Sequence, residues 1–328
     1  MKAAVITRPG GPEVLEIQDR PTPAPGHEQI LVRVRASAIN RADLLQRRGA
    51  YPAPPGAPPD IPGIEFAGEV AALGPGAREW REGDRVFGLV GGGAHAEYVV
   101  THERAVARVP DALSWDEAGA VPEVFITAHD ALRQADARPG DTVLVHAVGS
   151  GVGLAATQLA RAWGMRCLGT SRTADKLERA RDYGLDAGLA LGADLAPLAD
   201  FVAARTGGRG VNVALDLVGG PYLGATLGVV APLGRIVLIG TMGGARGELD
   251  FGRLLRQRIT LRGTVLRARP IEERIAVTRR FGTEVNSALA AGVVRAVIDS
   301  HFPLEAISRA HERLESNATF GKVGLTVA

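Results

Sequence analysis

The sequence is poor in cysteine: Cys167 is the only one in 328 residues. A single thiol forms no intramolecular disulfide, which fits a reducing compartment, so we expect a cytoplasmic protein. The chain also lacks an apolar run of about 18 residues, the length that a membrane helix requires. Its first residues, MKAAVITRPGGPEV, contain no apolar stretch long enough for a signal peptide.

An excess of charge is also missing. The 38 basic and 36 acidic residues give a net charge of +2, and no block of lysine or arginine of the kind that binds nucleic acid occurs. An RNA-binding role is therefore disfavoured, and steeply salt-dependent RNA binding would be needed to support one. The 46% of hydrophobic residues is ordinary for a globular protein, and the length predicts two domains.

The first 120 residues or so have the pattern of β structure. Residues 29–36 alternate apolar and polar side chains with period two, as a half-buried strand does. Further short strands are expected at residues 3–6, 15–17, 69–73, 84–88 and 95–100. Many short strands between turns predict a barrel-like β domain. The proline-rich stretch 51–63, YPAPPGAPPDIPG, is incompatible with a regular helix or a central strand, so we expect a stiff loop.

After Pro122 the pattern changes to alternating strands and helices. Strands are expected at residues 142–146, 165–170, 211–217, 235–239 and 260–266, and helices at 124–134, 152–163, 174–182 and 222–230. This alternation predicts a parallel sheet covered on both faces. The tail from about residue 270 has a helix at 271–291, a strand at 297–299, another helix, and a last strand at 321–327 that could return to the first domain.

The stretch 143–153, VLVHAVGSGVG, joins an apolar strand to a helix through glycines at alternate positions. Residues 151–156 fit the dinucleotide-binding pattern G-x-G-x-x-G/A, with alanine last. Small residues let backbone amides approach a pyrophosphate at the helix N-terminus. A plain strand-to-helix turn is the alternative, and the apolar strand and amphipathic helix around the loop favour a nucleotide site. The expected loop residues are Ala147, Gly149, Ser150, Gly151, Val152 and Gly153.

The residues after the second strand of this domain suggest which dinucleotide binds. An NAD enzyme usually carries Asp or Glu there to bind the ribose 2′-hydroxyl. Here the strand is followed by Ser171, Arg172 and Thr173, with Lys176 one helical step later, and no acidic residue precedes Asp175. Hydroxyls and cations suit a 2′-phosphate, so the sequence predicts NADPH. The alternative is that the two cations are solvated surface charges.

Four further segments carry a resemblance to a known family: residues 38–51 (AINRADLLQRRGAY), 62–68 (PGIEFAG), 93–98 (GAHAEY), and Asn317 followed by Gly321-Lys322-Val323. With the glycine loop, they resemble the zinc-independent quinone oxidoreductases of the medium-chain dehydrogenase/reductase superfamily, especially the branch that contains a human stress-inducible quinone reductase. The resemblance implies an α/β fold: a Rossmann domain with a doubly wound parallel sheet (123–267) plus a GroES-like β-barrel domain (1–122 and 268–328). It also implies a cleft between the domains, NADPH, and a homodimer or homotetramer.

The resemblance also bears on metal and substrate. Zinc-containing relatives have a histidine after the glycine at position 63 and a cysteine near position 40, where this chain has Ile64 and Asn40. We therefore expect no metal, which removes the Lewis acid that alcohol oxidation needs. Acceptors that take hydride readily remain: quinones first, and enals or enones as the alternative.

Three residues are candidates for catalysis. Tyr51 resembles a tyrosine of the related reductases, and its phenol could donate a hydrogen bond to a developing oxyanion, or merely pack at the loop edge. Ser150 could reach the nicotinamide or cap the next helix. Asn40 could hold the cofactor or a substrate carbonyl, or stiffen its turn. Thr127 resembles the threonine that contacts nicotinamide in the family, and the expected cofactor-binding set is completed by Gly240, Leu266 and Asn317.

Overall fold

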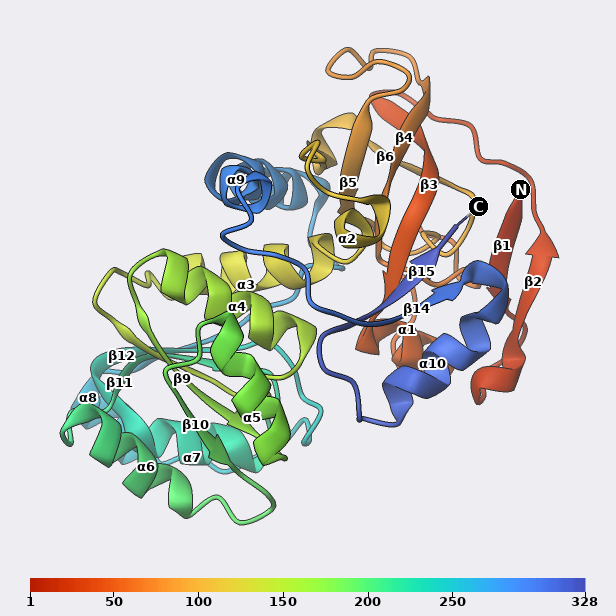
Figure 1. Ribbon diagram of the computed structural model, residues 1–328. Helices are drawn as coiled ribbons and strands as arrows, with labels where there is room; N and C mark the ends of the chain where they lie inside the picture. The colour runs from red at the N-terminus through yellow and green to blue at the C-terminus, as the bar shows by residue number, and fades with distance from the viewer. Residues whose placement is uncertain (328) are drawn as a thin grey trace. The chain divides into compact units, whose positions relative to one another are not determined.

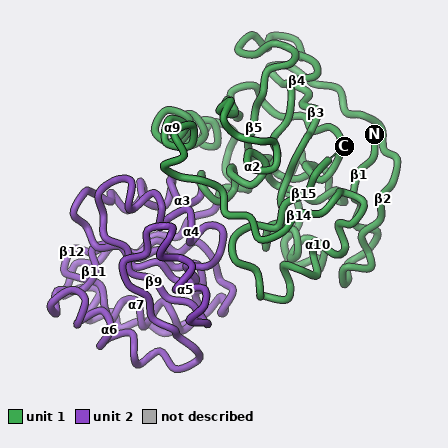
Figure 2. Tube along the Cα trace, viewed as in Figure 1, with its two compact units in different colours: residues 1–126, 266–328 green, residues 127–265 purple. Residues whose placement is uncertain are grey.

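The computed structural model describes residues 1–327 and divides the chain into two compact units (Figure 2). Unit 1 comprises Met1–Ile126 and Leu266–Ala328, and unit 2 comprises Thr127–Val265. The boundaries expected from the sequence lie a few residues away from these. The first unit boundary falls inside helix α3 (Pro122–Gln134), which the chain follows from one unit into the other.

Unit 1 is built on a mostly antiparallel sheet. The hairpin β1 (Lys2–Ile6) and β2 (Leu15–Asp19) forms a separate two-stranded sheet. The main sheet has the order β14 (Ile298–Pro303), β15 (Lys322–Thr326), β3 (Gln29–Ile39), β4 (Glu65–Leu73), β5 (Arg85–Leu89) and β7 (Val106–Arg108), and β6 (Tyr98–His102) also pairs with β3. One apolar core receives side chains from most of these strands, among them Val34, Phe66 and Leu325, so the sheet wraps around a single interior.

The helices of unit 1 are α1 (Arg41–Arg47), α2 (Trp115–Gly119), α9 (Ile271–Ala290) and α10 (Ile307–Glu315), with short 3₁₀ turns η1 (Pro12–Val14), η2 (Glu103–Ala105) and η4 (Leu304–Ala306). Helix α10 packs on β14 and β15 (Figure 1). Strand β15 pairs antiparallel with the second half of β3, which confirms that the last strand returns to the first domain. Residues 51–63 contain no helix or strand, as the prolines require.

Unit 2 has a parallel sheet in the order β10 (Ala187–Ala190), β9 (Arg166–Ser171), β8 (Thr142–Val145), β11 (Val211–Asp216), β12 (Val230–Leu238) and β13 (Thr260–Gly263). Its helices are α4 (Gly151–Ala162), α5 (Ala174–Ala180), α6 (Pro197–Thr206), α7 (Pro221–Val229) and α8 (Phe251–Gln257), with the turn η3 (Arg181–Tyr183). The strand order runs outward from β8 in both directions, and since crossovers between parallel strands are right-handed as a rule, this order puts helices on both faces, which is the doubly wound fold expected.

This strand order has a functional consequence. It reverses between β8 and β11, and in open parallel sheets ligands bind at such a reversal, beyond the carboxyl ends of the strands. The glycine-rich loop between β8 and α4 lies at this point. No helix described within residues 1–327 is both long and apolar enough to cross a membrane.

Candidate functional site

The loop after β8 makes a tight turn into α4. Ala147 has the positive φ of 52°, and the Ser150 N–H donates to the Ala147 carbonyl oxygen over 2.9 Å. Ser150 is the N-cap of α4, and its Oγ accepts from the Gly153 N–H at 3.1 Å. A Cβ on Gly153 would lie 2.7 Å from the Ala147 carbonyl oxygen, so only glycine allows this close approach. The expected cap is therefore present, and the Ser150 hydroxyl keeps its own proton for a further partner.

Residues after β9 lie against this loop. The Val148 N–H donates to the Thr170 carbonyl oxygen over 2.9 Å, which joins the two strand ends. A Cβ on Gly149 would meet Cβ and Cδ of Lys176 at 3.1 Å, so the aliphatic part of that side chain packs on the loop. Ser171 is buried, whereas Arg172 and Thr173 are exposed. The structure thus brings the glycine loop and Lys176 together at the carboxyl edge of the sheet.

The other predicted cofactor residues are distributed over both units. Gly240 follows β12, and a Cβ there would lie 2.8 Å from the Leu217 carbonyl oxygen. Thr127 is buried in α3, at the start of unit 2. Leu266 and Asn317 belong to unit 1. Asn317 has the positive φ of 58°, and its Oδ1 accepts from Arg41 Nη2 at 2.6 Å.

Sequence reasoning missed His146, the fully buried residue at the start of the loop. Its Nδ1 lies 2.8 Å from Thr170 Oγ1 and its Nε2 lies 2.8 Å from Thr226 Oγ1. Since the Thr226 hydroxyl donates to the Tyr222 carbonyl oxygen, it must accept from Nε2–H, which leaves Nδ1 to accept from Thr170. Burial lowers the pKa of the imidazole to about 4, against the opposing charge of Asp216. His146 is therefore neutral and braces the loop.

Tyr222, at the start of α7, was also missed. Its ring meets His146 edge-on with centroids 5.1 Å apart, and its hydroxyl donates to the Gly192 carbonyl oxygen over 3.5 Å. Burial raises the pKa of this phenol, the charge of Arg172 opposes that rise, and the charge of Asp216 adds to it. Tyr222 thus packs on the histidine that braces the glycine loop.

In unit 1, Asn40 belongs to a buried network. Lys322 Nζ donates to Asn40 Oδ1 at 2.6 Å and pairs with Glu65 Oε1 at 2.7 Å, while Asn40 Nδ2 donates to the same Glu65 oxygen at 2.8 Å and to the Ala38 carbonyl at 3.2 Å. Both amide protons and the amide oxygen of Asn40 are therefore engaged within the protein. This is the arrangement of a residue that stiffens its turn, and donation to a substrate would require breaking one of these bonds.

Two further bonds extend the network. The other Glu65 oxygen accepts from the backbone N–H of Glu123, at the start of α3. The Asp43 carboxylate accepts from the backbone N–H groups of Asn40 and Gly63 at 2.7 and 3.0 Å. Asp43, Glu65 and Lys322 are all at least nine-tenths buried. The network fixes the turn between β3 and α1 against β4, β15 and α3.

Tyr51 lies at the end of the turn after α1, half-buried, against the guanidinium of Arg267. The guanidinium carbon is 5.0 Å from the centre of the tyrosine ring. Burial raises the pKa of the phenol, the charge of Arg267 opposes that rise, and the charge of Glu123 adds to it. The Tyr51 hydroxyl has no hydrogen-bond partner among residues 1–327. It is therefore a protonated donor that is available to a ligand.

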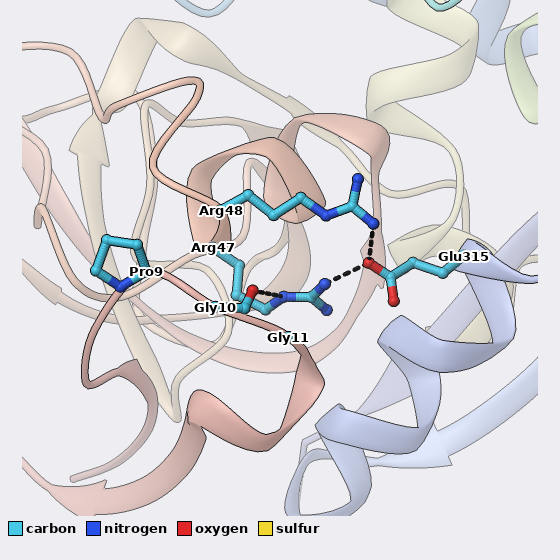
Figure 3. Close-up of a pocket in the computed structure, with 6 residues that line it drawn as sticks. All are labelled: Pro9, Gly10, Gly11, Arg47, Arg48 and Glu315. Carbon is cyan, nitrogen blue, oxygen red and sulfur yellow. Dashed lines mark hydrogen bonds and ion pairs between the residues drawn. The ribbon is translucent and has the colours of Figure 1, made fainter.

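A pocket of about 420 Å³ in unit 1 contains none of the predicted site residues. Figure 3 shows its two arginines, Arg47 and Arg48, converging on one carboxylate oxygen of Glu315. Arg47 is fully buried and also donates to the Gly10 carbonyl oxygen at 3.1 Å. Since both cations are already paired, the pocket marks a brace between α1 and α10. In the described part of the chain, no three His, Cys, Asp or Glu side chains are grouped as metal ligands.

Comparisons with known proteins agree with both units. Residues 26–111 match the alcohol dehydrogenase GroES-like domain, and residues 151–282 match the zinc-binding dehydrogenase family. The chain is 32% identical over 330 residues to the quinone oxidoreductase of Lama guanicoe, covering 99% of this chain and 97% of the relative. The Escherichia coli quinone oxidoreductase, solved with NADPH, has a TM-score of 0.86 and 30% identity over 99% of this chain and 100% of that one. An NAD-dependent alcohol dehydrogenase has the same TM-score and 33% identity over the whole of both chains.

The two-unit fold and these matches define an oxidoreductase of the medium-chain dehydrogenase/reductase class. Within that class, the chain belongs to the quinone oxidoreductase family. The resemblance carried by the sequence motifs is thereby confirmed, and so is the expected combination of a Rossmann domain with a GroES-like domain.

Proposed function

We propose that the chain is an NADPH-dependent reductase that transfers hydride to quinones without a metal ion. The observation that carries the cofactor assignment is the carboxyl end of β9. Arg172 and Lys176 follow this strand, and the first acidic residue, Asp175, is exposed on α5 with its carboxylate 3.9 Å from Arg179. Solved relatives of equal similarity differ in cofactor, so these residues of the chain support NADPH more than the relatives do.

The residues around the loop fit such a cofactor. Gly153 lets the loop pack closely on the first turn of α4, and the backbone N–H groups and dipole of this helix N-terminus would favour a pyrophosphate. Arg172 and Lys176, which follow β9, would hold the 2′-phosphate. NADPH supplies the hydride when it is bound. The protein's own residues would orient the acceptor and donate a hydrogen bond to its oxygen.

The donor set in unit 1 does not fit catalytic zinc, although one matching family is described as zinc-binding. Catalytic zinc takes three ligands from Cys, His, Asp and Glu. Asn40 and Glu65 instead share the ammonium of Lys322. The only thiol, Cys167, is buried in β9, and burial raises its pKa to about 12. The chemistry therefore has to proceed on an acceptor that is already electrophilic.

Tyr51 fits an acceptor that bears a carbonyl group, as quinones do and as the alternative enals and enones also do. A quinone carbonyl oxygen gains negative charge as hydride arrives, and a positioned donor stabilises that charge. Because burial raises the pKa of the Tyr51 phenol, its proton is retained at neutral pH. The phenol therefore acts as a hydrogen-bond donor to the acceptor oxygen and not as a base.

We further propose that the chain forms a homodimer through the edge of its parallel sheet. Strand β13 pairs with β12 on one side, and within residues 1–327 no strand pairs with its other edge. All four residues of β13 are exposed, Leu261 among them. An open edge with an apolar side chain favours pairing with a second copy. Light scattering after size exclusion should give a dimer, and Leu261→Lys should shift it to the monomer, whereas a monomeric wild type would contradict this proposal.

A stopped-flow panel tests the reductase function. NADPH oxidation is followed with ortho-quinones, para-quinones and enones, with NADH as the comparison and oxygen uptake as the monitor of one-electron transfer. We expect quinones to be reduced faster than enones, and NADPH to be used more efficiently than NADH. Faster enone reduction would replace the quinone assignment by alkene reduction. Equal efficiency with NADH, or stoichiometric zinc in the purified protein, would contradict the cofactor or metal assignment.

A further inference from the structure

Arg267 is a buried arginine that donates hydrogen bonds to three separate segments of unit 1. Its Nε donates to the Gly91 carbonyl oxygen at 2.7 Å, its Nη2 donates to Gln46 Oε1 at 2.5 Å, and its Nη1 donates to the Tyr51 carbonyl oxygen at 3.3 Å. The residue is only 8% exposed. Its guanidinium therefore fixes both the backbone of Tyr51 and, through the 5.0 Å stacking distance, the ring.

The charge of Arg267 has no carboxylate partner at ion-pair distance among residues 1–327. Asp43 and Glu123 act on it from further away, and burial lowers its pKa. A buried cation without a paired carboxylate is costly unless hydrogen bonds and a polarisable face compensate for it. Here three neutral oxygen acceptors and the face of Tyr51 do so. These contacts keep the guanidinium charged at a position over the ring of Tyr51.

This environment has two effects on the phenol. The hydrogen bond to the Tyr51 carbonyl and the stacking restrict the ring to one orientation, while the hydroxyl stays without a partner in the described chain. The positive charge also favours the developing phenolate character of a tyrosine that donates to an anion, which makes it a stronger donor. Orientation and polarisation are both properties that a donor to a developing oxyanion requires.

We propose that Arg267 is the positioning residue that presents the Tyr51 hydroxyl to the carbonyl oxygen of the electron acceptor and strengthens it as a donor. This inference rests on the proposed reductase function and names the pair that would serve it. Arg267 is separated from Tyr51 by most of the chain, and the return of the chain to unit 1 after residue 265 brings the two together.

A double-mutant cycle tests the inference. Tyr51→Phe, Arg267→Met and the double variant are compared for the kcat and KM of quinone reduction with saturating NADPH. Loss of one positioned donor should lower kcat about a hundredfold with little change in KM, since the contact strengthens only in the transition state. If Arg267 acts through Tyr51, the double variant should be no slower than the slower single variant. If the decrease in kcat of the double variant equals the product of the two single decreases, the inference is overturned.

The titration of Tyr51 gives a second readout that does not require turnover. The phenolate absorbance of the wild type minus that of Tyr51→Phe isolates this tyrosine. Removing the neighbouring cation in Arg267→Met should move its titration to higher pH. An unchanged titration would overturn the inference even if activity fell, because a purely structural arginine would affect folding without setting the electrostatics of the phenol.

Two variants keep the test decisive. Arg267→Lys preserves the charge but not the planar stacking and fork, so the titration should stay near that of the wild type while kcat falls. If Arg267→Met does not fold, Arg267→Lys is used in its place. A kcat of Arg267→Lys equal to that of the wild type would then contradict the inference. Arg8→Met, an exposed arginine of the same unit, is the matched control and should change neither readout. If the wild type itself does not reduce quinones, the proposed function fails, whereas the titration still reports on the pair.

Discussion

Acidification should destabilise unit 2 through His146. In the unfolded chain this imidazole titrates near 6.5, whereas in the folded unit burial lowers its pKa to about 4. Between these values the unfolded chain binds more protons than the folded one, so stability falls as the pH falls. The free energy of unfolding therefore carries no penalty from His146 above pH 6.5, and it falls progressively as the pH decreases from 6.5 to about 4.

The magnitude follows from the difference between the two pKa values. At about 1.36 kcal/mol for each pKa unit, the loss reaches about 3 kcal/mol once the pH lies below both values, and about 2 kcal/mol at pH about 5. Protonation also removes an acceptor, because Nδ1 would no longer accept from the Thr170 hydroxyl. His95 and His311, whose pKa values burial also lowers, act in the same direction in unit 1.

The assay must therefore isolate unit 2 and His146. Trp163 lies in unit 2, whereas Trp80 and Trp115 lie in unit 1, so a Trp80→Phe, Trp115→Phe background makes fluorescence report on unit 2. Urea unfolding is measured at pH about 7.5 and about 5, with and without His146→Gln. We expect the loss on acidification to shrink by about 2 kcal/mol in the glutamine variant. An equal loss in both proteins would refute the assignment of this pH dependence to His146.

Three further variants test the two sites. Gly153→Ala places a Cβ 2.7 Å from a carbonyl oxygen of the loop and should weaken NADPH binding at least about tenfold by calorimetry, whereas Gly228→Ala, where the added Cβ meets nothing within 4 Å, should not. Lys322→Met leaves the buried Glu65 carboxylate without its ammonium and should cost about 3 to 5 kcal/mol in urea unfolding, and an unchanged midpoint would contradict the pair. Arg172→Ala should raise the KM for NADPH severalfold with kcat nearly constant, because a uniform binding contact is lost; an unchanged KM would exclude Arg172 from the site.

Local patterns in the sequence were sufficient for the strongest elements. The period-two alternation of β3 and the apolar strand before the glycine loop predict strands that the structure contains. Strands β7 and β10 and helices α1, α2, α6 and α8 were missed. Strand β10 is a four-residue edge strand, AGLA, with little side-chain signal, and its place depends on pairing with β9. Short elements of this kind are set by tertiary contacts and not by periodicity.

One strand was placed too early for the same reason. The alternation suggested residues 95–100, whereas β6 runs from Tyr98 to His102. His95 donates its N–H to the Pro62 carbonyl oxygen and accepts from the Ala4 N–H, so the start of this stretch is bound to other segments and not to β3. These partners lie far away in the sequence, and no local pattern reveals them.

The candidate site shows a similar division. The glycine loop and the residues after β9 follow a local motif whose spacing is visible in the sequence. Arg267 and Tyr222 carry no such motif, because they reach their partners only through the path of the chain. The state of Asn40 likewise depends on Lys322, which arrives from the other end of the sequence. The sequence was sufficient to predict which residues lie near a motif. It was not sufficient to predict the hydrogen bonds that those residues make within the folded protein.

Because β15 pairs with β3, unit 1 is completed only when the last strand of the chain has been synthesised. Unit 2 is one continuous segment, so all of its strands have left the ribosome while unit 1 still lacks α9, β14, α10 and β15. Since domains fold as units while the chain emerges, the nucleotide-binding half can mature first. Until Lys322 is translated, the Glu65 carboxylate lacks its cation, so a nascent chain stalled before this point would hold a complete Rossmann domain and an incomplete unit 1.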